Sequence, residues 1–342
     1  MLEVSRLRKM DEKVWNEYVL KSSNSTFYHQ IGWKKVIEKT YKHKPIYLVA
    51  REDGEVKGIL PLFLMKSMFF GKKLVSVPFA PYGGVCADNE LIANALIKEA
   101  KRITKEWDAD YLELRQFDRI GTEFVISNTY VTQILRLNRN YDLIWSTLRK
   151  SMRRYVRKAT ENDLQIIINS KNIKDFYTIY SQTMHNLGTP AHSYAFFKNI
   201  LLEFPKDTNI AIVEYKGRII SAIFLLYFKD TVIYGWGASL REYLKLNPNY
   251  LLFWEVIKYS CEKGFNSFDF GRSQPNTGVF LFKTGWGAKP KQLCYQYYLN
   301  NINKIPDTSQ LNPRRQKFAK IWNKLPNLLT NKLGPILRSN IP

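Results

Sequence analysis

A glycine-rich loop late in the chain carries two cations that could act on an anion. Residues 271–278 read Gly-Arg-Ser-Gln-Pro-Asn-Thr-Gly, and Lys283 follows shortly after them. Glycine and proline allow a backbone to turn sharply or to approach a ligand closely. Arg272 and Lys283, at the two ends of this turn, could hold an anionic group or stabilise a developing oxyanion. The plainer alternative, which spacing alone favours, is a β-hairpin with solvated charges, its strands at Phe268–Phe270 and Val279–Phe282.

A second set of charges lies near the middle of the chain. Two rows of cations recur at four-residue spacing, and they are Arg149, Arg153 and Arg157, and Lys150, Arg154 and Lys158. On a helix these rows form one continuous basic face. Because like charges at this spacing repel, a bound polyanion would relieve the repulsion, and arginine favours phosphate. A solvated linker helix is the alternative, and the sequence leaves both open.

His185 is one of only four histidines, and it lies near the end of an expected helix that begins at Phe176. An imidazole in that place could act as a general base. A lone histidine near a helix end is more often a packing or capping residue. We therefore keep both interpretations.

The composition indicates packed domains with anionic partners. The 342 residues favour about two domains; 45% of them are hydrophobic, and the formal charge is +22. This excess suggests phosphate-rich ligands, RNA or an anionic membrane surface, unless the source proteome is basic throughout. Three cysteines that are far apart predict neither a disulfide framework nor a zinc site. Since the first residues lack an apolar signal-peptide core, we expect a cytoplasmic protein.

The elements that must position these residues occur twice in the same order. Each copy has a hairpin, a third strand, a glycine-bearing loop, a helix and a final strand. In the first copy the hairpin covers 45–64, the third strand 74–79, the helix 89–107 and the last strand 111–115. In the second copy they cover 210–228, 231–234, 249–263 and 267–270. The sequence therefore predicts an internally duplicated α/β (mixed α+β) fold.

We expect three parts along the chain. Residues 1–145 form the first domain, residues 146–300 form the second domain preceded by the basic helix, and residues 301–342 form a tail. The tail places apolar residues at helical spacing among arginines and lysines, and Pro326 and Pro335 interrupt it. A basic amphipathic segment of this kind suits the surface of an anionic membrane. The alternative is a helix that packs on the protein's own surface.

The element order in both halves resembles two tandem copies of the GNAT (acyl-CoA N-acyltransferase) fold. Tandem copies with a basic helix between them resemble the FemAB family of aminoacyl and acyl transferases. The motifs that carry the resemblance are Phe27-Tyr28-His29-Gln30-x-x-Trp33, Pro81-Tyr82-Gly83-Gly84 with Asp88, Arg153-Arg154-x-x-Arg157-Lys158, Leu187-Gly188-Thr189-Pro190, Phe268-Asp269-Phe270-Gly271-Arg272-Ser273 and Phe282-Lys283-x-x-Trp286-Gly287. In the tail, Trp322-x-x-Leu325-Pro326 and Leu333-Gly334-Pro335 resemble the FemAB-related branch of exopolysaccharide and PEP-CTERM gene clusters.

The resemblance implies an enzyme that transfers an amino acid from tRNA to an amine of a cell-envelope precursor, without a bound cofactor or metal. It implies that Lys283 stabilises the transition state and that Asp88 is a possible base. It also implies that the basic helix faces tRNA or nucleotide phosphates. The further residues expected to contact substrate are Tyr82, Trp236, Arg272 and Ser273.

Two departures leave the acyl donor open between aminoacyl-tRNA and acyl-CoA. Neither copy has the R/Q-x-x-G-x-G/A motif that holds the CoA pyrophosphate, and no long coiled-coil arm for tRNA is evident. One alternative is therefore CoA-dependent N-acetylation of a nucleotide- or lipid-linked aminosugar. Another, of a different class, is a non-catalytic RNA- or membrane-binding protein. The sequence does not predict an oligomeric state.

Overall fold

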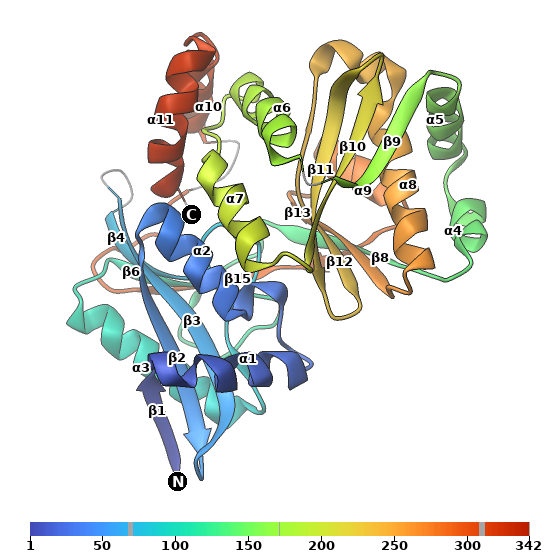
Figure 1. Ribbon diagram of the computed structural model, residues 1–342. Helices are drawn as coiled ribbons and strands as arrows, with labels where there is room; N and C mark the ends of the chain where they lie inside the picture. Colours follow the sequence, from blue (N-terminus) through green and yellow to red (C-terminus); the bar gives the residue numbers. More distant parts are fainter. Residues whose placement is uncertain (68–70, 171, 308–311, 342) are drawn as a thin grey trace. The chain divides into compact units, whose positions relative to one another are not determined.

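The computed structural model describes residues 1–67, 71–170, 172–307 and 312–341 (Figure 1). The chain divides into two compact units, and each is described separately. Unit 1 comprises residues 1–130, 292–309 and 337–342. Unit 2 comprises residues 131–291 and 310–336.

Unit 1 is built on a mixed sheet in the order β1-β2-β3-β4-β6-β15-β7, with β5 paired to β3. The strands are β1 (Leu2–Arg6), β2 (Lys44–Glu52), β3 (Glu55–Ser67), β4 (Gly71–Ser76), β5 (Cys86–Ala87), β6 (Tyr111–Gln116), β7 (Val125–Ser127) and β15 (Cys294–Leu299). The pair β4–β6 is parallel, and the other paired strands are antiparallel.

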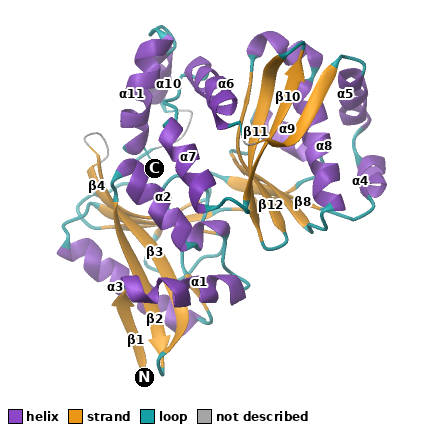
Figure 2. Cartoon of the chain, viewed as in Figure 1, coloured by secondary structure: helices purple, strands orange, loops and turns teal. Residues whose placement is uncertain are grey.

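Helices cover both faces of this sheet (Figure 2). They are η1 (Lys9–Asp11), α1 (Glu12–Lys21), η2 (Phe27–His29), α2 (Ile31–Tyr41) and α3 (Glu90–Glu106). Because successive strand residues point to opposite faces, Ile46 and Leu48 pack in one cluster with α3, whereas Tyr47 packs against Trp15 of α1. The helix α3 begins where the Asn89 side chain accepts a hydrogen bond from the amide of Ile92.

Unit 2 has a sheet in the order β14-β8-β13-β12-β11-β10-β9. Its strands are β8 (Val131–Arg136), β9 (Leu164–Ser170), β10 (Thr208–Tyr215), β11 (Arg218–Phe228), β12 (Thr231–Ser239), β13 (Ser267–Ser273) and β14 (Lys289–Gln292). Its helices are α4 (Tyr141–Thr147), α5 (Lys150–Thr160), α6 (Ile173–Asn186), α7 (Tyr194–Glu203), η3 (Arg241–Leu246), α8 (Pro248–Glu262), α9 (Gly278–Gly285), α10 (Pro313–Trp322) and α11 (Asn327–Ser339). The last residues of α11, from 337 on, are counted with unit 1.

The duplicated element order is confirmed in the two sheets. The elements β2, β3, β4, α3 and β6 of unit 1 correspond to β10, β11, β12, α8 and β13 of unit 2. In each unit the strands that flank the helix pair in parallel. The first hairpin turns at Asp53 and Gly54, and the second at Lys216 and Gly217, all four with positive φ. Two such central residues are the hallmark of the tight turns that suit the twist of a hairpin.

The chain exchanges a strand between the sheets, which the sequence did not predict. The strand β8 follows the elements of unit 1 but lies beside β13 in the sheet of unit 2. Conversely, β15 follows the elements of unit 2 but lies between β6 and β7 in unit 1. The expected boundary after residue 145 therefore falls inside unit 2, and the one after residue 300 falls inside a segment of unit 1. Each exchanged strand satisfies the outer backbone groups of a parallel strand.

Candidate active site

The strands β12 and β13 separate in unit 2 after a short parallel pairing. Their register runs from Thr231–Ser267 to Ile233–Asp269 and ends there. Beyond that point β12 continues along β11, and β13 continues along β8 with an irregular register. Ligands of mixed sheets commonly bind where neighbouring parallel strands part at their carboxyl ends. Backbone carbonyls of β13 that no longer face β12 at this point can line a ligand-binding site.

Lys283 lies where β12 and β13 separate. Its side chain is 4% exposed, and its Nζ donates to the carbonyls of Gly271, at 2.8 Å, and Arg272, at 3.0 Å. Burial lowers the pKa of Lys283 to about 8, with Asp269 opposing the shift and Arg272 adding to it. An ammonium has three hydrogens, and among the described residues only these two carbonyls accept from it. The third hydrogen is available to a substrate oxygen.

The segment that carries Lys283 is a helix, so the expected strand Val279–Phe282 is wrong. The Thr277 side chain accepts from the amide of Phe280 and begins α9. Val279 and Leu281 are exposed, while Lys283 and Gly285 point inward. A run of four apolar residues does not distinguish strand from helix by periodicity. The threonine at the start of α9 was the signal available.

Gln133 of β8 holds this site together, and sequence reasoning missed it. Its buried amide nitrogen donates to the carbonyl of Phe280, at 3.0 Å, and to Oγ1 of Thr284, at 2.8 Å. Its carbonyl accepts from Ser273 Oγ at 2.7 Å. One side chain thus joins β8, β13 and α9 next to Lys283. No motif marks a lone glutamine, and its role depends on the exchanged strand.

Asp269 fixes the backbone that binds the ammonium. The carboxylate is 2% exposed and accepts from Thr132 Oγ1 and from the amide of Gly271, the latter at 2.7 Å. Gly271 has φ +70°, and an added Cβ would lie 3.0 Å from the carbonyl oxygen of Tyr234. Only glycine adopts this conformation readily in so little space. Of the two predicted neighbours, Arg272 is exposed and Ser273 is buried.

Trp236 lies on β12 beyond the point where the strands part. Its indole meets the rings of His192, Phe196 and Phe197 edge-on, with centroid distances from 5.4 to 6.2 Å. His192 stacks on Phe196 at 4.2 Å and is 1% exposed. The half-buried Trp236 thus forms an aromatic wall with α7. The predictions named Trp236 but not His192, which no motif distinguishes.

The basic face of α5 is confirmed as a helical surface in unit 2. Met152, Val156 and Ala159 are buried in the core cluster that includes α8, and the cations lie on the other side. Arg154, Arg157 and Lys158 are exposed and Arg153 is half-buried. Among the described residues, no carboxylate forms an ion pair with these four side chains.

Aromatic and sulfur contacts connect α5 to the helix of Lys283. Tyr155 packs on Tyr250 at 4.6 Å, and Tyr250 meets Phe282 edge-on at 5.3 Å. Gly285 lies so close to Met152 that an added Cβ would be 2.7 Å from its sulfur. The cationic face and the buried ammonium therefore belong to neighbouring elements of one unit.

The corresponding opening of unit 1 is filled by the protein itself. Arg115 forms an ion pair with Glu113 at 2.7 Å and donates to the carbonyl of Ala80 at 3.0 Å. The amide of Gly83 donates to the carbonyl of Arg115, also at the end of β6. Tyr82 is buried between Tyr28 and Phe117. The predicted Tyr82 is thus a core residue of the loop that closes unit 1.

Asp88 and His185 make contacts that fit structural roles. Asp88, in unit 1, is exposed and accepts from the hydroxyl of Tyr18 at 2.8 Å. His185, in unit 2, binds the carbonyl of Leu325 through Nε2 at 3.0 Å. That contact ties α6 to the turn between α10 and α11. Neither residue contacts the Lys283 ammonium among the described residues.

The tail packs on unit 2 by one face and exposes apolar residues on another. Trp322 is 3% exposed, and Gly188 leaves room for Ala319. The exposed apolar residues of α10 and α11 are Phe318, Ile321, Leu328, Leu329, Leu333 and Ile336. Within the described residues, no helix is both long and apolar enough to cross a bilayer. That same part of the chain holds no metal-binding cluster of histidine, cysteine, aspartate and glutamate.

The chain is similar in sequence to a known domain family and to curated glycyltransferases. A model of the acetyltransferase (GNAT) domain matches residues 146–283. The lipid II:glycine glycyltransferase of Staphylococcus epidermidis is 29% identical over 102 residues, which are 27% of this chain and 24% of that protein. The glycyltransferase of the same name from Staphylococcus haemolyticus is 27% identical over 122 residues, which are 33% of this chain and 29% of that protein. The match thus spans about a quarter of the length of these curated relatives.

Solved structures resemble the whole fold. The crystal structure of FemX has a TM-score of 0.65 at 17% identity and covers 87% of this chain and 98% of its own. A tandem GNAT protein from the clavulanic acid biosynthesis pathway has a TM-score of 0.58 at 11% identity, covering 89% of this chain and 100% of its own. The mixed α/β fold with tandem GNAT-like units is confirmed, and so is the FemAB-like resemblance.

Proposed function

We propose that this FemAB-like chain is an N-acyltransferase that moves an aminoacyl or acyl group onto an amine of a cell-envelope precursor. The single observation that carries the proposal is the buried Lys283 ammonium, held by two carbonyls where β12 and β13 part. The glycyltransferase relatives act, by their names, on lipid II and glycine. A lipid- or nucleotide-linked saccharide of peptidoglycan or exopolysaccharide is therefore the acceptor class that we propose.

In the proposed reaction, the acceptor amine attacks the carbonyl carbon of the donor ester or thioester. The new C–N bond forms, the electron pair of the C=O moves onto oxygen, and the bond to the donor oxygen or sulfur breaks as the carbonyl re-forms. The amine gives up its proton, and the leaving group takes one. Lys283 would donate its third hydrogen to the oxyanion. A fixed donor of this kind is worth on the order of 3 kcal/mol in the barrier.

The donor that we propose is aminoacyl-tRNA. The exposed cations of α5 suit a phosphate backbone, and arginine binds phosphate in a bidentate manner. The stretch 240–248 between β12 and α8 contains no glycine, so it lacks the flexible loop that cradles a pyrophosphate at a helix start. This argues against acyl-CoA, whose use in N-acetylation of an aminosugar is the second candidate function.

A membrane-surface location fits a lipid-linked acceptor. Residues 310–342 contain seven lysines and arginines and no acidic residue, beside the exposed apolar face of α10 and α11. We therefore propose a cytoplasmic enzyme that works at the inner face of the membrane. A non-catalytic RNA- or membrane-binding protein would share this charge but would have no use for a buried ammonium.

The donor experiment supplies purified protein with lipid II and either glycyl-tRNA or radiolabelled acetyl-CoA. We expect label to pass from the tRNA to the acceptor amine, and none to pass from acetyl-CoA. Transfer from acetyl-CoA alone would identify the second candidate function. Binding of both substrates without transfer from either would favour the binding protein.

A further inference from the structure

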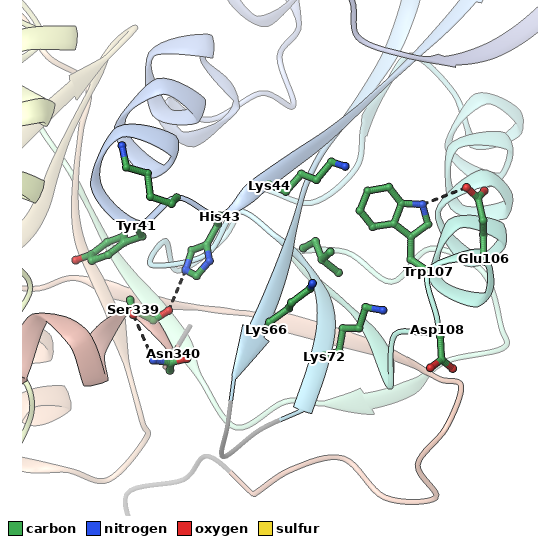
Figure 3. Close-up of a pocket in the computed structure, with 12 residues that line it drawn as sticks. Tyr41, His43, Lys44, Lys66, Lys72, Glu106, Trp107, Asp108, Ser339 and Asn340 are labelled. Atoms are coloured by element: carbon green, nitrogen blue, oxygen red, sulfur yellow. Dashed lines mark hydrogen bonds between the residues drawn. The ribbon is translucent and has the colours of Figure 1, made fainter.

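A pocket at one end of the unit 1 sheet is lined by lysines that the proposed reaction does not use. It measures about 660 Å³ and lies where α3 ends at Glu106 and Trp107 (Figure 3). Lys44, Lys66 and Lys72 come from the neighbouring strands β2, β3 and β4 and extend toward the same region. The pocket lies at the ends of β4 and β6 where these parallel strands begin, opposite the ends that the Tyr82 loop closes.

The sheet register forces these three charges together. Lys66 and Lys72 are directly paired across β3 and β4, and Lys44 pairs with Leu64 two positions from Lys66. All three share a face with Ile46, Leu64 and Leu74 of the core under α3. They lie just past the end of that helix, beside the pocket that they line. Like charges directly opposite on adjacent strands destabilise a sheet.

In the described part of the chain, the three ammonium groups share their pocket with the carboxylates of Glu106 and Asp108. None of the three ammonium groups forms an ion pair with a carboxylate there. The two acidic residues of the pocket have other partners: Glu106 pairs with Arg6 and Arg102, and Asp108 accepts from Asn301. Lys44 lies over the ring of Trp107 at 4.3 Å, which fixes the ammonium without cancelling its charge.

The C-terminus of α3 can stabilise only part of the positive charge of these lysines. A helix C-terminus carries roughly half a negative charge and favours one nearby cation. The positive charge of three lysines is larger than the charge of the helix end. Like charges opposite each other on paired strands are unfavourable without a compensating interaction. A bound anion would neutralise the remainder. Phosphate groups are anionic and accept hydrogen bonds from lysine.

We propose that Lys44, Lys66 and Lys72 form a second binding site, for a phosphate or pyrophosphate group, at the α3 end of the unit 1 sheet. The group has two possible sources. One is a soluble phosphorylated compound that occupies the pocket, and the other is the phosphate headgroup of an anionic lipid. The site is independent of the proposed transferase reaction.

The test titrates full-length protein with inorganic pyrophosphate by calorimetry, and in parallel measures co-sedimentation with vesicles of phosphatidic acid in phosphatidylcholine. We expect binding in at least one arm, weakened as salt is raised. The triple pocket variant Lys44→Gln, Lys66→Gln, Lys72→Gln should lose affinity on the order of a hundredfold, as expected for three charged contacts. Pyrophosphate binding that the triple pocket variant loses would identify a soluble ligand. Vesicle binding that this variant weakens while the tail is intact would identify a headgroup.

Two controls keep the result interpretable. The variant Lys9→Gln, Lys13→Gln, Lys21→Gln removes the same net charge from exposed positions of unit 1 and should bind as the wild type does. Because the pocket lysines repel, the triple pocket variant should fold with an unchanged or higher Tm. Absence of binding in both arms, or equal loss in the two triple variants, would overturn the proposal. Lys283→Met should leave this binding unchanged, so the result is separate from that of the transferase assay.

Discussion

Lys283 is a buried lysine, and burial disfavours its charged form, so this residue should make the stability of the protein depend on pH. Its pKa is about 8 in the folded protein and 10.5 as the ordinary value. Between these values the unfolded chain binds more protons than the folded one, so this lysine makes stability rise with pH. Below about pH 8 the full penalty is present, and above 10.5 it is gone.

We therefore expect the pH dependence of stability to differ between the wild type and Lys283→Met. From pH 8 to 10.5 the free energy of unfolding of the wild type should rise relative to that of the variant. Urea unfolding at several pH values measures this difference. A constant difference across that range would mean that Lys283 is not a buried ammonium in solution.

Gln133 should act as the positioning residue of the site. The change Gln133→Leu leaves the carbonyl of Phe280 and the hydroxyls of Ser273 and Thr284 without this partner. We expect a loss of about 1–3 kcal/mol in unfolding free energy and a lower kcat. As a comparison, Gln182→Leu alters a glutamine of α6 and should leave kcat unchanged. Equal kcat in the wild type and Gln133→Leu would remove Gln133 from the site.

At the level of single residues, the sequence predicted the ammonium but not what surrounds it. Lys283 stood in a motif with Trp286 and Gly287, whereas Gln133 stands alone on a strand from a distant part of the chain. The family resemblance named Asp88 and chemical type named His185, and their contacts are with Tyr18 and Leu325. Residue type predicts what a side chain can do, but only packing decides what it touches.

At the level of elements, α5 should bind the phosphates of the donor. Its exposed cations have no ion-pair partner among the described residues, and its buried face is packed within unit 2. Charge reversal of Arg153, Arg154 and Arg157 to glutamate should weaken tRNA binding and flatten its dependence on salt. The change Lys9→Glu, Lys13→Glu, Lys21→Glu is the matched control. A binding curve indifferent to salt in the wild type would contradict phosphate contact.

The outward face of α11 should contact the membrane. Leu329, Leu333 and Ile336 repeat at helical spacing and are exposed, while Thr330 and Gly334 face the protein. Changing these three apolar residues to serine should abolish co-sedimentation with anionic vesicles and leave Tm nearly unchanged, because all three side chains are exposed. Retained vesicle binding would contradict this assignment, and a change of oligomeric state would show instead that the face binds a second copy.

Helices and strands could be predicted where the hydrophobic periodicity extended over many residues. The prediction failed where the apolar run was short. The helix α3 and both hairpins follow the expected ranges closely. The segment Val279–Phe282 has four apolar residues, too few to separate a strand from a helix, and it forms part of α9.

At the level of the whole chain, the duplication could be predicted and the strand exchange could not. The repeated order of elements is visible in the sequence because each copy carries its own turns and its own helix. By contrast, β8 and β15 are antiparallel strands that satisfy the same hydrogen bonds in either sheet. The alternation of apolar and polar residues in these strands does not indicate which sheet they join. The boundaries between the units therefore could not be predicted from the sequence.

The central claim is that the Lys283 ammonium stabilises the transition state of acyl transfer. Its most direct test is single-turnover transfer of glycine from glycyl-tRNA to lipid II by the wild type and Lys283→Met, with the affinity for each substrate measured in parallel. We predict that the variant binds both substrates as the wild type does and that transfer slows about 10²- to 10³-fold. Transfer at the rate of the wild type, with both substrates bound, would contradict the account.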